Sequence, residues 1–247
     1  MIVGAAVLPT APLLIPGVSA TLPDGLGKVR GCVDAAVASL PPCDVLVLVA
    51  AGVGGVHGSG LVSLEGLGRG DLSTQVPVST KAVAALQSAA SISGEAPRQD
   101  GPLPLDLGVL ALHVAAVAPV APVSVPGDAP FQELSAAGAA IARTFDGADV
   151  RAAVVVAGDL SAGLTEKSPL HLVSGAIFWD EQAVAAVDGG RMDALARLGP
   201  EEATRVGARG WAALAVLAGL TRETRFAMVV RHYSAPRGVG YMVASGG

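Results

Sequence analysis

Short runs built almost entirely from apolar residues constrain the fold of this chain most strongly. Val45–Ala50 and Ala152–Ala157 are apolar at every position, as strands covered on both faces are. Further strand-like runs lie at Ile2–Leu8, Val109–Val114, Val120–Val125 and Arg225–Tyr233. Helical segments separate several of these runs. The alternation predicts an α/β fold, a sheet with crossover helices, and it permits a mostly parallel central sheet with helices on both faces.

Ordinary capping residues mark three of the expected helices. They are Ser79 before Thr80–Ala90, Asp128 before Pro130–Phe145, and Pro200 at the start of a helix that runs to about Gly219. Trp211, in the third helix, is expected in the core. The glycine-rich stretches Gly52–Gly70 and Gly94–Gly101 do not shift the composition enough to mark a boundary. We therefore expect one domain over residues 1–247.

Charge and composition exclude several classes of partner. The net charge is −5, the 16 Lys and Arg residues are scattered, and only 8 residues are aromatic, which disfavours nucleic-acid binding. The apolar stretch Leu107–Val125 is interrupted by His113, Pro119 and Pro122, so a membrane span is not expected. The first residues lack the basic region of a signal peptide, which predicts a cytoplasmic protein. Cys32 and Cys43 are expected to be two buried thiols.

Loops that follow the strands are where a site is expected. In open α/β sheets ligands bind beyond the carboxyl ends of the strands. This rule selects the loops Pro9–Pro12, Gly52–His57 and Gly158–Ala162. In the last strand-like run, His232 shares one face with Phe226 and Met228, so it is either a core residue or a ligand.

Four segments of the chain resemble a known family. They are AAVLPTAPLLIPGV near the start, DVLVLVAAG from Asp44, AGDLSAGLTEKSP from Ala157, and YSAPRGVGYMVA from Tyr233. In order and spacing they are similar to the B-type subunits of the class III extradiol ring-cleavage dioxygenase family, including its MEMO-type relatives. The resemblance spans nearly the whole chain and implies the extradiol dioxygenase-like version of the α/β fold.

The resemblance also implies a mechanism that this chain does not support. Family members hold Fe(II) with two histidines and a carboxylate, and a further histidine acts as acid and base. At the ligand positions this chain has Thr10, Gly52 and Ser234, and at the position of the catalytic histidine it has Ala162. These side chains do not form a shell for iron or zinc. Neither Fe(II) nor Zn is therefore expected, and no cofactor is predicted.

Two functions remain open from the sequence. The first is a non-catalytic relative that binds a small molecule or a protein partner through the former active-site crevice or its surface. The second is an enzyme, such as a dioxygenase-related oxidoreductase, with a site rebuilt around Asp159, Ser161, His57 and His171, and also His232. Each of these residues has a structural interpretation as well, such as a capping role for Asp159. We expect the histidines not to converge. A homodimer is compatible with either function.

Overall fold

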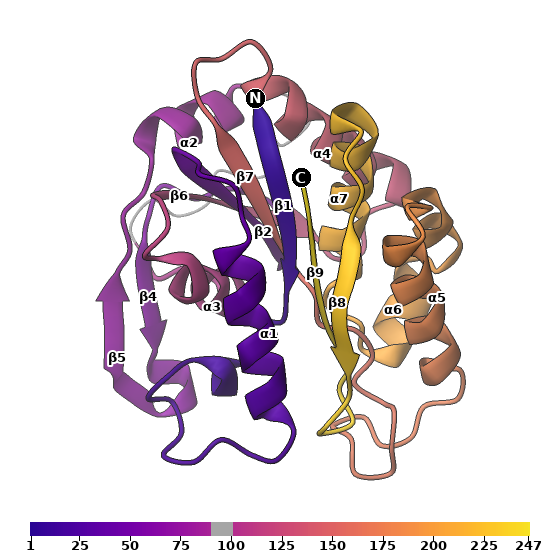
Figure 1. Ribbon diagram of the computed structural model, residues 1–247. Coiled ribbons are helices and arrows are strands. Elements are labelled where there is room, and N and C mark those ends of the chain that lie inside the picture. Colours follow the sequence, from indigo (N-terminus) through magenta and orange to yellow (C-terminus); the bar gives the residue numbers. More distant parts are fainter. Residues whose placement is uncertain (90–100) are drawn as a thin grey trace.

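A seven-stranded sheet forms the centre of the protein in a computed structural model, which describes residues 1–89 and 101–247 (Figure 1). The strand order is β3-β6-β2-β7-β1-β9-β8. The four central strands are parallel and comprise β6 (Val120–Pro126), β2 (Val45–Gly52), β7 (Ala152–Ala157) and β1 (Ile2–Leu8). This confirms the predicted α/β class and the mostly parallel core of the sheet.

Antiparallel strands complete both sides of the sheet. β3 (Gly55–Val56) pairs with β6, while β9 (Tyr241–Gly246) lies between β1 and β8 (Val229–Ser234). A separate two-stranded sheet contains β4 (Leu61–Leu64) and β5 (Arg69–Gln75).

Helices cover both faces of the large sheet, as predicted. One face packs against α1 (Leu26–Ala38) and α3 (Leu105–Val114), and the other against α5 (Ala176–Asp188) and α7 (Trp211–Thr224). On this second side α4 (Phe131–Phe145) packs mainly against α7. The smaller α2 (Thr80–Gln87) contacts β3 and β6, and α6 (Pro200–Val206) precedes α7. Short 3-10 helices occupy Pro12–Leu14, Glu65–Leu67 and Met192–Arg197.

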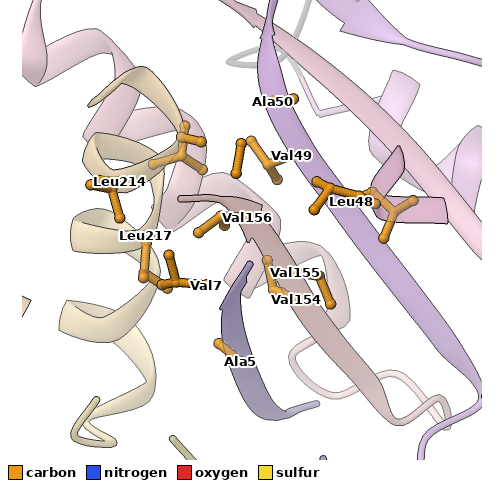
Figure 2. Packing of buried hydrophobic residues seen from close by; sticks show 14 of the residues in the cluster. Ala5, Val7, Leu48, Val49, Ala50, Val154, Val155, Val156, Leu214 and Leu217 are labelled. Atoms are coloured by element: carbon orange, nitrogen blue, oxygen red, sulfur yellow. The ribbon is translucent and has the colours of Figure 1, made fainter. Parts of the chain in front are cut away.

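The core consists mainly of small and branched side chains that interlock between the sheet and α7. Figure 2 shows Leu214 and Leu217 of α7 against Val7 and Val156, all of them fully buried. Trp211 is also buried, as predicted, and its indole donates a hydrogen bond of 3.3 Å to the carbonyl of Leu195. Such a core suits a sequence that is rich in Ala, Val and Leu but poor in aromatic residues.

Backbone contact between α4 and α7 depends on two glycines. A Cβ atom added to Gly138 would lie 1.8 Å from the carbonyl oxygen of Val216, and one added to Gly219 would lie 1.7 Å from that of Ser135. Neither position has room for any side chain, so the two helices approach as closely as backbones can.

Several sequence predictions were wrong in detail. Val109–Val114 lies in α3 rather than in a strand, because a short run that is buried on all sides has no periodicity to distinguish the two. The single helix expected from Pro200 is two helices, since Gly207 adopts φ +74° and ends α6.

Other expected boundaries moved as well. The strand predicted from Arg225 begins at Val229, and a register shift between Val230 and His232 interrupts its alternation. Cys32 and Cys43 are free thiols, but they are half-buried rather than buried.

Two further expectations concern the length of α2 and the absence of a membrane-spanning helix. The helix predicted over Thr80–Ala90 ends earlier, at Gln87, with Ser88 as its C-cap. Ala90 and most of the stretch Gly94–Gly101 lie outside the described residues. Among the described residues, no helix has the length and apolar character needed to cross a membrane.

Candidate functional site

Three of the expected loops leave the sheet at the same edge. Leu8 pairs with Ala157, and Val49 pairs with Val156, both in parallel register. The loops after β1, β2 and β7 therefore begin side by side, at what we call the carboxyl-terminal edge. This arrangement follows the rule by which the sequence selected them.

Thr10 and Asp159 join two of these loops. The Thr10 backbone N–H donates to Asp159 Oδ2 at 2.7 Å, and the Thr10 hydroxyl donates to the same oxygen. Both residues are buried. The Asp159 carbonyl also accepts a hydrogen bond from Gly210 N at 2.7 Å, where α7 begins. Asp159 is thus the point at which the first loop, the loop after β7 and α7 meet.

Burial changes the acidity of Asp159. Desolvation raises its pKa from 3.8 to about 6, the hydrogen bonds from Thr10 oppose this shift, and the nearby Asp106 carboxylate adds to it. Arg209 lowers the pKa slightly and pairs with Asp106 at 2.7 Å. Burial and the charge of Asp159 together raise the pKa of Tyr241 to about 12. A carboxyl group that titrates near neutrality can exchange protons with a ligand.

Ser161 belongs to a second buried cluster. Its N–H donates to Asp180 Oδ1 at 2.9 Å, its hydroxyl donates to the same oxygen, and the Tyr233 hydroxyl donates to Asp180 Oδ2 at 2.7 Å. Burial raises the pKa of Asp180. Because Ser161 is fully buried and engaged with Asp180, its role in this structure is to tie the loop after β7 to α5.

The segments GDLS and GVGY pair with each other through their backbones. Leu160 N donates to the Gly240 carbonyl at 2.8 Å, and Gly240 N donates to the Ser161 carbonyl at 2.9 Å. A Cβ on Gly240 would lie 2.1 Å from Asp180 Oδ2, and Gly238 adopts φ +73°. Packing at Gly240 and backbone conformation at Gly238 therefore favour glycine without any catalytic requirement.

His57 lies at the start of the loop that follows β3, beside β6. Its Nε2 is 2.9 Å from Ser124 Oγ, and burial lowers its pKa. Ser124 also limits the end of β2, because a Cβ on Gly52 would lie 2.9 Å from Ser124 Cβ. The end of β2 is therefore restricted to glycine at this position unless β6 moves.

The remaining histidine candidates have other partners. His171 is exposed, adopts φ +55°, and places Nδ1 3.2 Å from the Glu166 carbonyl. His232 Nε2 lies 2.8 Å from Ser234 Oγ. Asp159, Ser161, His57, His171 and His232 thus each make separate contacts. Within residues 1–89 and 101–247, no three His, Cys, Asp or Glu side chains are placed to hold a metal ion.

Sequence reasoning missed four residues near Asp159 or Thr10. Asp106, Arg209 and Tyr241 affect Asp159 or are affected by it, and His113 of α3 interacts with the backbone of Pro9. Burial lowers the pKa of His113 to about 4, and its Nε2 is buried without a hydrogen-bond partner among the described residues. Tyr241 stood within the GVGY segment, but nothing in the sequence related the other three to the loops.

Comparison with known proteins supports the fold but assigns no family. The sequence matches no protein-family model, and no curated protein sequence matches it significantly. The crystal structure of the uncharacterized protein JW3007 from Escherichia coli K12 is similar, with a TM-score of 0.64 at 14% sequence identity. The alignment covers 98% of this chain and 99% of that chain, so the similarity extends over the whole fold.

Proposed function

We propose that the chain is a non-catalytic member of the class III extradiol ring-cleavage dioxygenase-like family. It binds a small molecule or a protein partner at the carboxyl-terminal edge of the sheet or on the adjoining surface. Four sequence segments support the assignment, and the α/β architecture is compatible with it. The packing between GDLS and GVGY gives a reason for a relative to keep these segments without catalysis.

The observation that carries the proposal is the contact between Thr10 and Asp159. Thr10 occupies the position of a family metal ligand, yet both of its donors are directed to Asp159 Oδ2. At the other two ligand positions, Gly52 has no side chain and the Ser234 hydroxyl lies against His232. These residues do not fit Fe(II) or Zn, so no reaction step at a metal follows from them.

One observation favours the alternative of a rebuilt enzyme. Asp159, with a pKa of about 6, lies near the Arg209–Asp106 pair and Tyr241, and such a carboxyl group is suited to proton transfer. The other members of the rebuilt site do not join it, since Ser161 binds Asp180 and His57 binds Ser124. A substitution of Asp159 therefore distinguishes the two functions, because only the rebuilt enzyme would need its carboxyl group.

Metal content and oxygen consumption test the proposal directly. The protein is purified without a histidine tag, analysed for iron and zinc, then loaded with Fe(II) and supplied with catechols. A non-catalytic protein contains substoichiometric metal and consumes no oxygen above the rate of free iron. Stoichiometric metal together with catechol-dependent oxygen consumption would contradict it. Under the alternative, Asp159→Asn abolishes turnover, whereas Asp34→Asn on the exposed side of α1 retains it.

Binding is tested separately with catechol as the probe. Saturation-transfer NMR is expected to detect catechol bound to the wild type without its consumption. Ala162→Phe, at the position of the family's catalytic histidine, should weaken that signal, whereas Ala35→Phe on an exposed face of α1 should not. If both variants changed the catechol signal equally, the carboxyl-terminal edge would not be the binding site.

A further inference from the structure

A cavity of about 370 Å³ lies between the C-terminal ends of α5 and α7 and the segment that leads into β8. It is far from Thr10, because the end of α7 lies beside Met1, where β1 begins (Figure 1). Arg191, Arg222 and Arg225 line it, above buried apolar atoms of Ala218 and Met228. We call it the arginine cavity. Its size falls within the range of small-molecule sites.

An adjoining hollow of about 560 Å³ extends the same surface. It shares Gly190, Arg191 and Asp193 with the arginine cavity and adds Arg197. Four of the chain's 16 basic residues therefore line this region of a protein whose net charge is −5. Arginine side chains are therefore concentrated in this region, although the protein as a whole carries a net negative charge.

Most of this positive charge has no acidic partner in the described part of the chain. Asp193 accepts a hydrogen bond from Arg222, which pairs one guanidinium. The side chains of Arg191, Arg197 and Arg225 make no ion pair and no hydrogen bond with any residue that the structure describes. Their donors are therefore available to an anion.

Helix termini do not account for these arginines. The C-terminal carbonyls of a helix attract cations, and both α5 and α7 end here. Backbone groups already satisfy several of these carbonyls, since Arg191 N donates to the Ala186 carbonyl and Arg225 N donates to that of Thr221. The guanidinium groups are not needed for capping.

Arg225 also holds a conformation that favours glycine. It ends α7 with φ +59°, a left-handed backbone that most side chains disfavour. A strained residue whose side chain lines a cavity is a reason to look for a ligand there.

We propose that the arginine cavity binds a small organic dianion, specifically a phosphate monoester with an apolar group. Guanidinium groups donate paired hydrogen bonds to phosphate oxygens, and Arg191 and Arg225 supply two such groups at the cavity wall. The apolar floor at Ala218 and Met228 receives the rest of the ligand. This site is separate from the carboxyl-terminal edge and does not depend on the function proposed for it.

Titration calorimetry with phenyl phosphate tests the proposal, with phenol and inorganic phosphate as comparisons. The wild type should bind phenyl phosphate more tightly than either comparison, because only phenyl phosphate uses both the arginines and the floor. Arg191→Gln and Arg225→Gly should each weaken binding about tenfold or more, since each removes charged hydrogen bonds. Arg151→Gln, at an exposed site near the start of β7, should leave the affinity unchanged.

Arg225→Gly separates binding from folding. Glycine relieves the left-handed backbone, so this variant should unfold at the same temperature as the wild type or higher while it loses affinity. No detectable binding of phenyl phosphate by the wild type would overturn the proposal. An unchanged affinity in Arg191→Gln and Arg225→Gly, or an equal loss in Arg151→Gln, would also overturn it.

Discussion

Asp159 is a buried carboxyl group whose neighbours come from distant parts of the sequence. Thr10 donates from the first loop, Gly210 donates to its carbonyl from the start of α7, and Tyr241 of β9 forms an isolated bridge with it. Ionisation of this carboxyl group places a charge away from water, and two hydrogen bonds only partly replace the lost hydration. The folded state is therefore more stable with Asp159 protonated, because desolvation of the charge outweighs the hydrogen bonds from Thr10, which by themselves favour the carboxylate.

Stability should fall with rising pH because of Asp159. Its pKa rises from 3.8 to about 6 on folding, so the folded state binds more protons between these values. The loss begins above the unfolded value and is complete above about pH 6, and a pKa change of this size corresponds to about 3 kcal/mol. Urea unfolding from about pH 4 to about pH 7 should show a flatter profile for Asp159→Asn than for the wild type. Asp34→Asn should keep the wild-type profile.

Only part of the site could be predicted from the sequence. The rule for α/β sheets selected loops that do begin at one edge of the sheet, and Asp159 and Ser161 were named as candidates. Their partners could not be inferred, because Thr10 reaches Asp159 only when β1 pairs with β7, and Asp180 reaches Ser161 only when α5 is in place. Side-chain contacts of this kind depend on the tertiary arrangement and leave no local pattern.

At the scale of elements, the contact between α4 and α7 leaves no room for a side chain at Gly138 or Gly219. Gly138→Ala should lower the free energy of unfolding by at least about 2 kcal/mol, because the new methyl group meets the Val216 carbonyl. Gly31→Ala is the matched control, since Gly31 lies in α1 with open space around it. That substitution should raise the stability by up to about 1 kcal/mol. Urea unfolding measures the free energy of unfolding of both variants. Equal changes in the two variants would contradict the close backbone contact at Gly138.

Element types followed the sequence where periodicity or capping was clear. Ile2–Leu8, Val120–Val125 and Ala152–Ala157 are strands as predicted, and the helix from Pro130 was placed within one residue. Val109–Val114 was misassigned as a strand, because the largely buried helix α3 has the composition of a core strand. β9 was not predicted, although it belongs to the sheet interior, because Gly and Ser weaken its strand signal.

At the scale of the molecule, one sheet unites strands from the whole sequence. β1 pairs with β7 and β9, and β2 pairs with β6 and β7. We expect a single cooperative unfolding transition, with coincident curves from Trp179 and Trp211 fluorescence and from far-ultraviolet circular dichroism. Two separated transitions would instead indicate two folding units within residues 1–247.

The position of β1 has a consequence for biosynthesis. Its sheet partners begin at Ala152 and Tyr241, so a ribosome must translate most of the chain before this apolar strand has a neighbour. Until then, nascent β1 exposes unpaired backbone and side chains that can associate with other chains. Folding that depends on such distant pairings is slow, and chaperones that shield apolar segments during translation would increase the yield of native protein.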